Sequence, residues 1–149
     1  MAKIALDGTP TNTIGELPKV GTKAPNFKLV KKDLSTATLD DYNGSKVILN
    51  IFPSVGTGVC AAAVRHFNEM ASGLENTKVL CISRDLPFAQ TSFCGAEGLD
   101  NVIMLSDFND ASFGKDFGLL VTDGAFNGLL SRVIIILDEN GTITYTEQV

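Results

Sequence analysis

Residues 46–60 read KVILNIFPSVGTGVC, and this stretch decides the fold. Residues 46–52 are rich in β-branched side chains and almost wholly apolar, which predicts a short strand buried on both faces of a sheet. The proline and glycines that follow allow a sharp turn. Apolar side chains then recur at helical spacing, which predicts a helix over 58–73. The members of this apolar stripe are Val59, Ala63, Phe67, Met70 and Leu74.

Cys60 lies in the first turn of the predicted helix, and Thr57 stands where an N-cap is expected. Free backbone N–H groups and the positive end of the helix dipole favour a thiolate over a thiol at this position. Because only a small fraction of an ordinary cysteine is ionised at neutral pH, such a placement raises the reactive fraction. The stretch therefore predicts thiol chemistry at Cys60.

Length and composition indicate one globular domain, residues 1–149, of which 44% are hydrophobic and 19% charged. The formal net charge is −5 and no block of Lys or Arg exists, which argues against nucleic acid or an anionic membrane as a partner. No apolar run approaches the length of a membrane span. With no signal-peptide pattern near the N-terminus and only three cysteines, the sequence predicts a cytoplasmic protein.

Further apolar, β-branched runs predict more strands. They cover residues 78–83, 102–105 and 132–137. The last of them is predicted to pair with residues 142–146 as a hairpin across the Asn140–Gly141 turn. Weak alternation around residues 7–8 predicts another β-hairpin at the N-terminus, over about residues 1–17.

A second helix is predicted from about Asp85, with Pro87 in its first turn and Gly95 as its stop, and a shorter one over 111–117. This order of elements is that of the thioredoxin-like α/β architecture, a mixed central sheet flanked by helices on both faces. The loop of residues 118–131 is too apolar to lie free in solvent. We expect it to form the wall of a substrate pocket or a dimer contact.

Several segments resemble the thiol peroxidases, a branch of the peroxiredoxins with two working cysteines in one chain. They are Phe52–Cys60, Val79–Gln90, Phe93–Leu99, Asp123–Gly124 and the strand that begins at Arg132. The similarity runs from about Gly21 to the end of the sequence. Such folds normally finish with a helix packed over the sheet, whereas this sequence stops in a strand pattern at residues 146–149. Either the sequence is truncated or the final helix is absent, and this leaves open how one face of the sheet is covered.

The resemblance implies roles for particular residues. Cys60 is then the peroxidatic cysteine, and Cys94 is the resolving cysteine that joins it in an intramolecular disulfide. Arg132 faces the peroxidatic sulfur, which Pro53 shields from water. The hydroxyl of Thr57, three residues before the thiolate, can donate a hydrogen bond to it and hold a peroxide oxygen.

Other readings of these residues are weaker. Arg65 follows Cys60 in the same helix, but the residues between them are alanine and valine rather than a glycine-rich phosphate loop, which argues against a phosphatase. At roughly 100° per residue, Arg65 and His66 project away from Cys60 and are expected at the surface, so a Cys–His hydrolase is also disfavoured. Cys81 lies mid-strand and is expected to be inert core. No pair of residues has the spacing of a zinc site.

The sequence thus predicts a thiol-dependent peroxidase that reduces hydrogen peroxide and organic hydroperoxides in antioxidant defence. The resemblance implies thioredoxin as the reductant and a homodimer, and the reaction needs no metal or organic cofactor. Two alternatives stay open. One is a general protein disulfide oxidoreductase, and the other is a redox-sensing interaction module whose oxidised form binds a partner.

Overall fold

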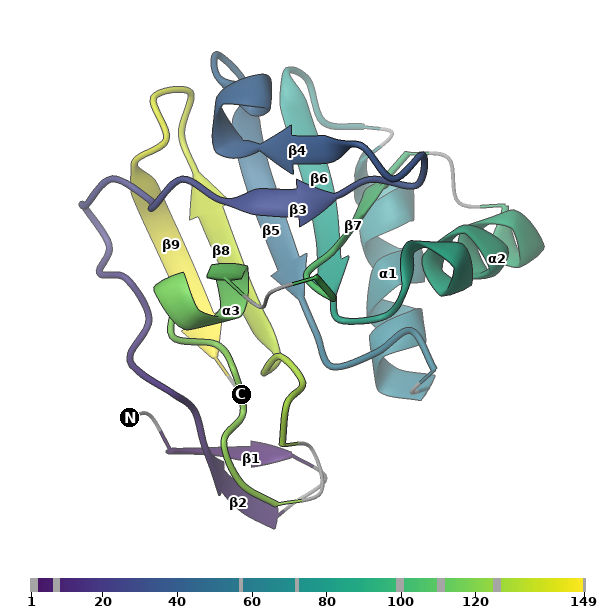
Figure 1. Cartoon of the computed structure of the whole chain (residues 1–149). Helices are drawn as coiled ribbons and strands as arrows, with labels where there is room; N and C mark the ends of the chain where they lie inside the picture. Colours follow the sequence, from purple (N-terminus) through teal and green to yellow (C-terminus); the bar gives the residue numbers. More distant parts are fainter. Residues whose placement is uncertain are drawn as a thin grey trace.

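The computed structural model describes residues 3–6, 9–56, 58–71, 73–98, 101–109, 112–124 and 127–148. These residues form a seven-stranded mixed sheet and a separate two-stranded hairpin (Figure 1). The strand order in the large sheet is β4-β3-β7-β6-β5-β8-β9. The predicted α/β class, with a mixed central sheet, is confirmed.

The centre of the sheet is parallel. Strands β5 (Lys46–Ile51), β6 (Thr77–Ser83) and β7 (Ile103–Ser106) pair in that order. Helix α1 (Gly58–Ala71) connects β5 to β6, and helix α2 (Pro87–Glu97) connects β6 to β7. These are the two strand–helix–strand units that the periodicity predicts. None of the helices in the described part of the chain is long and apolar enough to cross a bilayer.

Antiparallel strands extend the sheet on both sides. Strand β8 (Val133–Leu137) pairs with β5, and β9 (Ile143–Gln148) pairs with β8, which confirms the predicted C-terminal hairpin. On the opposite edge, β3 (Lys28–Val30) and β4 (Thr36–Thr38) form a second hairpin that the sequence analysis did not predict. It joins the sheet through a single pair, Val30 with Ser106 of β7.

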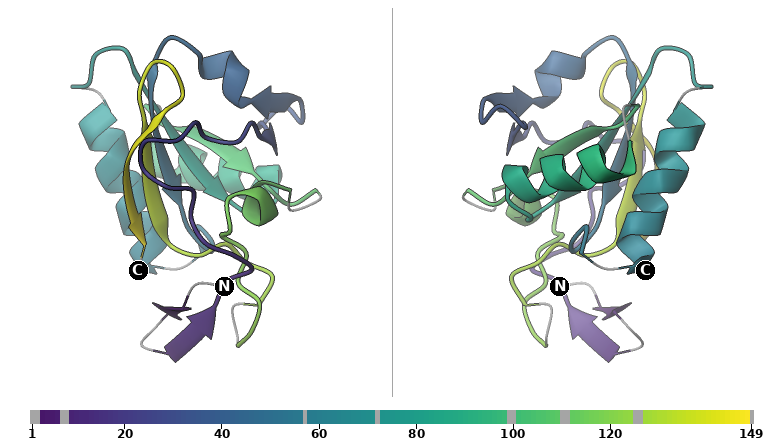
Figure 2. Two further views of the ribbon diagram at one scale, coloured as in Figure 1. Left: turned by 90° about the vertical axis from the view of Figure 1, so that its left-hand side faces the viewer. Right: turned by 90° about the vertical axis from the view of Figure 1, so that its right-hand side faces the viewer.

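The predicted N-terminal hairpin is confirmed as β1 (Lys3–Leu6) and β2 (Thr9–Asn12), although its tip lies outside the described residues. It stands apart from the large sheet, beside the loop that precedes β8 (Figures 1 and 2). Asn12 binds the carboxylate of Asp123 twice, through its backbone N–H at 2.9 Å and its side-chain amide at 2.7 Å. Thr13 forms a backbone bridge with Val121.

The sheet separates two apolar clusters, because successive residues of a strand point to opposite faces. Leu49 and Ile51 of β5 belong to the cluster that includes Phe113 and Phe117, which lie in and just after α3 (Ser112–Asp116). Ile48 and Phe52 belong to the cluster under α1 and α2. Helices therefore cover both faces, as predicted. The single helical turn η1 (Leu39–Tyr42) packs its Leu39 and Tyr42 against the first cluster.

The apolar loop of residues 118–131 corrects one prediction. Leu119 and Leu130 are fully buried in the cluster on the α3 face, and Val121 is fully buried as well. These three side chains complete the core of this chain and do not form a pocket wall or a dimer contact. Leu120 and Leu129 of the same loop are half-buried, and for them the prediction stays a prediction. Phe126, which was part of the same prediction, lies outside the described residues.

The buried stripe of α1 also differs from the predicted one. Cys60 and Val64 are buried, and Phe67 and Ala71 pack against the same cluster. Met70 is 42% exposed and Leu74 is 39% exposed. The helix ends at Ala71, so Leu74 lies beyond it and cannot continue the stripe. Cys60 is thus on the buried side of its helix.

The end of α2 also differs from the predicted one. The helix does not stop at Gly95 but continues to Glu97, and Gly98 closes it in the left-handed conformation at φ 67°. The backbone N–H of Gly98 donates to the carbonyl of Cys94. A left-handed residue after the last turn is the usual place for glycine, because it carries no Cβ. Cys94 therefore lies in the last turn of α2.

Gly95, inside α2, and Gly98, which follows its last residue, offer a paired stability test. Both have open space where a Cβ would be, and only Gly98 has a positive φ. Gly98→Ala should lower the free energy of unfolding by about 1 kcal/mol, because a Cβ strains the left-handed conformation. Gly95→Ala should raise it by about 0.5–1 kcal/mol through helix propensity. Denaturant unfolding of the two variants measures both, and two effects of equal sign would contradict the assignment of the helix end.

Candidate active site

Cys60 is the third residue of α1, so its predicted place in the first helical turn is confirmed. Its side chain is only 2% exposed and packs in the apolar cluster with Phe52 and Val64. It is a thiol, as are Cys81 and Cys94, and no disulfide joins them. A sulfur at the amino end of a helix meets backbone N–H groups that stabilise negative charge. The apolar surroundings keep bulk water away from it.

Asp85, which the sequence indicates only as the start of the second helix, holds the turn that leads to Cys60. Pro53 is buried at the beginning of this turn. Ser54 Oγ donates to Asp85 Oδ1 at 2.6 Å, and the Val55 N–H donates to Asp85 Oδ2 at 2.8 Å. The carboxylate of Asp85 thus fixes the segment between β5 and α1.

Thr57, the predicted N-cap and peroxide-binding hydroxyl, lies outside the described residues.

Arg132 immediately precedes β8. In that strand Ile134 and Ile136 contact the cluster under α1, and strand alternation places Arg132, two residues before Ile134, on the same face. Its side chain lines a small cavity of about 80 Å³ together with Ala63 and Phe67 of α1. Its Nε is buried and has no hydrogen-bond partner among the described residues.

The structure separates the two candidate arginines. Arg65 and the neighbouring His66 are exposed on α1, as predicted for both. The cavity that Arg132 lines is mostly apolar, and its other polar lining residues are Asn50 of β5 and Glu147 of β9. Arg132 is therefore the arginine that shares the buried side of α1 with Cys60.

Cys94 and Cys81 belong to the same apolar cluster as Cys60 but differ in access to solvent. Cys94 is half-buried and lines a surface groove of about 480 Å³ between α2, β7 and the β3–β4 turn. Lys31 and Lys32 also line this groove. The cluster thus brings both predicted redox cysteines beneath α1 and α2, with only Cys94 reaching an open surface.

Cys81 lies in the middle of β6 and is completely buried. Burial raises the pKa of its thiol to about 12, although the side-chain amide of Asn50 donates to its sulfur at 3.6 Å and opposes the shift. The charge of nearby Cys94 raises the pKa further. A thiol that stays protonated at neutral pH is a poor nucleophile. The prediction that Cys81 lies in the core is confirmed.

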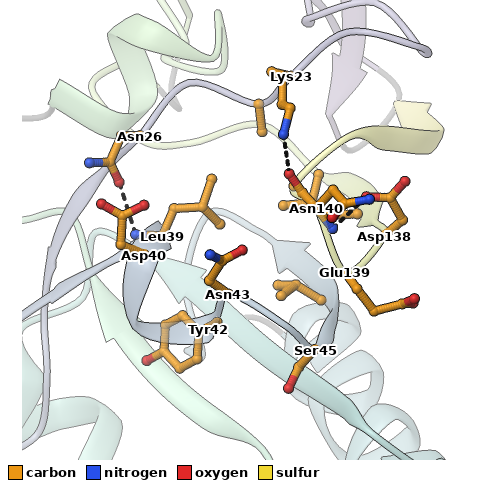
Figure 3. A pocket seen from close by; sticks show the side chains of 14 residues that line it. Lys23, Asn26, Leu39, Asp40, Tyr42, Asn43, Ser45, Asp138, Glu139 and Asn140 are labelled. Carbon is orange, nitrogen blue, oxygen red and sulfur yellow. Dashed lines mark hydrogen bonds between the residues drawn. The ribbon is translucent and has the colours of Figure 1, made fainter.

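A second polar groove, of about 230 Å³, lies elsewhere on the molecule (Figure 3). It lies beside the β8–β9 turn, where Lys23 Nζ donates to the carbonyl of Asn140 at 2.6 Å, and near Ser45 at the start of β5. Cys60 follows the opposite end of β5, so this groove is no part of the thiol site. The described residues contain no cluster of His, Cys, Asp and Glu that could hold a metal ion.

Comparisons with known proteins agree with this fold. The family model described as Redoxin matches residues 19–149. The chain is 51% identical to the thiol peroxidase of Corynebacterium glutamicum, with all of this chain and 90% of that protein aligned. It is 52% identical to the thiol peroxidase of Mycobacterium tuberculosis, with all of this chain and 89% of that protein aligned.

Solved structures give the same result. A peroxiredoxin-like protein from Aquifex aeolicus superposes with a TM-score of 0.93 at 34% identity, over all of this chain and 86% of that one. A thiol peroxidase from Chromobacterium violaceum superposes with a TM-score of 0.92 over all of this chain and 87% of that one, and at 22% identity it supports the fold alone. The fold and the cysteine at the start of α1 define a thioredoxin-like redoxin domain. Within that class the chain belongs to the thiol peroxidase family, whose members are peroxiredoxin-type peroxidases.

The environments of the cysteines predict different reactivities toward an alkylating agent. In the native, reduced protein at about pH 8, iodoacetamide should modify Cys94 and leave Cys81 unmodified, because burial both blocks Cys81 and raises its pKa to about 12. Concentrated guanidinium chloride should make the two react alike. Mass spectrometry of the digested protein measures this. Equal labelling of Cys81 and Cys94 in the native state would contradict the described core.

Proposed function

We propose that the chain reduces hydrogen peroxide and organic hydroperoxides with Cys60 as the peroxidatic cysteine. The observation that carries the proposal is the position of Cys60 in the first turn of α1, on the face that it shares with Arg132. The Cys60 thiolate attacks the terminal peroxide oxygen, the O–O bond breaks, and the leaving oxygen takes a proton and departs as water or an alcohol. Cys60 becomes a sulfenic acid.

Arg132 is proposed to stabilise the charge that develops in this step. A guanidinium group beside the reacting atoms favours the thiolate and offsets negative charge on the leaving oxygen. Its buried Nε has no hydrogen-bond partner among the described residues, so that donor is available to a substrate oxygen. Thr57 is proposed to hold the peroxide through its hydroxyl. Buried Pro53 is proposed to limit the access of water to the sulfur.

Cys94 is proposed to resolve the sulfenic acid. Its thiol attacks the Cys60 sulfur, water leaves, and a Cys60–Cys94 disulfide forms. Thioredoxin or a similar dithiol protein then reduces the disulfide by thiol exchange. Cys94 lines an open groove while Cys60 is buried, so the Cys94 sulfur is the one that an incoming thiolate can reach. The cations of Lys31 and Lys32 on the groove wall favour the approach of a thiolate.

We also propose where this cycle takes place and in which oligomeric state. Recycling by a dithiol protein needs a reducing compartment, which supports a cytoplasmic location and a role in antioxidant defence. The resemblance to thiol peroxidases also implies a homodimer. Leu86 and Phe88, beside the first turn of α2, are 51% and 64% exposed and provide apolar surface for such a contact.

A coupled assay tests the assignment of the cysteines. With thioredoxin, its reductase, NADPH and cumene hydroperoxide, Cys60→Ser should abolish turnover, because the attacking sulfur is lost. Cys81→Ser should retain most of it, because that thiol stays protonated in the core. The assay also separates the alternatives, since a disulfide oxidoreductase would reduce insulin and ignore peroxide, and a redox sensor would react without turnover. Comparable losses in both folded variants would overturn the assignment.

The choice of arginine has its own test. Arg132→Ala should lower kcat/KM for peroxide by about 100-fold, because a donor aimed at developing charge is removed. It should also slow the alkylation of Cys60 by iodoacetamide at a fixed pH, because a cation that favours the thiolate is lost. Arg65→Ala is the matched control on the exposed side of α1 and should change neither quantity. A larger effect of Arg65→Ala would show that the wrong arginine was chosen.

A further inference from the structure

Asp85 lies between the two segments that carry the redox cysteines. It follows β6 and stands two residues before Pro87, the first residue of the Cys94 helix. Its side chain reaches back to the turn between β5 and α1, which leads to Cys60. One carboxylate therefore connects the turn before Cys60 to the segment before Cys94.

The carboxylate of Asp85 accepts three short hydrogen bonds. Two come from Ser54 Oγ and the Val55 N–H, at 2.6 and 2.8 Å, and the third comes from Ser83 Oγ at 2.6 Å. Ser54 Oγ in turn accepts the Gly56 N–H at 3.0 Å. The whole turn of residues 54–56 is thus organised around this carboxylate. Hydrogen bonds to an ionised acceptor are stronger than those between neutral groups.

The backbone that carries Asp85 is fixed from the other side. The side chain of Arg84 donates to the carbonyls of Asp107, Phe108 and Gly128, at 3.2, 3.2 and 2.8 Å. The hydroxyl of Ser106 donates to the carbonyl of Asp85. The turn before Cys60 is therefore tied to the segment after β6, whose own backbone and side chains are held by these hydrogen bonds.

We expect disulfide formation to require a loosening of this arrangement. Cys60 begins α1 and Cys94 lies in the last turn of α2, and a disulfide needs the two Cα atoms within about 7 Å. Holding Cys60 at the amino end of an intact helix suits the attack on peroxide. The same restraint opposes the movement that brings the two sulfurs together.

We infer that Asp85 is a positioning residue that holds Cys60 in its peroxide-reactive place and slows disulfide formation. This inference rests on the proposed function. Removing the charge should therefore change the two steps in opposite directions. The peroxide reaction of Cys60 slows, because the first turn of α1 is less fixed. The condensation of the Cys60 sulfenic acid with the Cys94 thiol, which releases water, becomes faster.

Asp85→Asn is the direct test. The amide is close in size to the carboxylate, but its NH₂ group cannot accept, so at least one of the three donors loses its partner. Rapid mixing with peroxide, quenching with dimedone or N-ethylmaleimide, and mass spectrometry give the rates of sulfenic acid and disulfide formation separately. We expect the first rate to fall and the second to rise, each by on the order of tenfold.

Two further variants make the test independent of folding. Asp138→Asn is the matched control, because that carboxylate also accepts two backbone N–H groups, from Asn140 and Thr142, in a turn remote from Cys60. It should leave both rates unchanged. Ser54→Ala keeps the Asp85 charge and removes one of its donors, so it should shift both rates in the same directions as Asp85→Asn and by less.

The outcomes distinguish a failure of the proposed function from a failure of the inference about Asp85. Wild-type protein that forms no Cys60 sulfenic acid or no Cys60–Cys94 disulfide would overturn the proposed function, and the inference about Asp85 with it. With a working wild type, a fall of both rates in the Asp85→Asn and Ser54→Ala variants, or no change in either, would show a merely structural role and overturn the inference alone. If Asp85→Asn fails to fold, the rates of Ser54→Ala decide.

Discussion

The structure depends on β5, which pairs with β6 on one side and with β8 on the other. Because its side chains alternate between the faces, Leu49 and Ile51 build one apolar cluster while Ile48 and Phe52 build the other. A strand buried on both faces cannot slip by one residue without exchanging its two cores. This register determines where the strand ends, and therefore where α1 begins and where Cys60 lies.

Most of this could be predicted because the signals are local. The strand pattern of residues 46–52, the helical period after it and the Asn140–Gly141 turn each lie within a few residues. The β3–β4 hairpin was missed because each strand has only three residues, too few for an alternation to show. The end of α2 was misplaced because Gly95 and Gly98 are indistinguishable by type, and only backbone φ separates them. Leu119 and Leu130 were misjudged because a run of apolar residues does not reveal which surface covers it.

The residues of the candidate site also divide into those with a local sequence signal and those without one. The placement of Cys60 in the first turn of α1 and of Cys94 near the end of α2 followed from short motifs, and alternation along β8 accounts for the face that Arg132 occupies. Asp85 could not be found in that way. Its partners Ser54 and Val55 lie about thirty residues earlier, and hydrogen bonds between such distant segments leave no periodic trace in the sequence. The available signal was an acidic residue directly between a buried strand and a helix, where a local role as a helix start is an equally good explanation.

The three cysteines show how burial can divide chemistry among identical groups. All three contact one apolar cluster, yet Cys81 is locked in a strand with its pKa raised to about 12, Cys60 starts a helix, and Cys94 reaches an open groove. A nucleophile for peroxide gains from a fixed, dry position, whereas a resolving thiol must be able to move and to meet an external reductant. The last turn of a helix satisfies the second need, because helix ends open at low cost in free energy. In the proposed cycle, a restraint on the Cys60 side together with an end that can fray on the Cys94 side would order the two steps. Peroxide reduction would be favoured by the intact structure, and disulfide formation by its local opening.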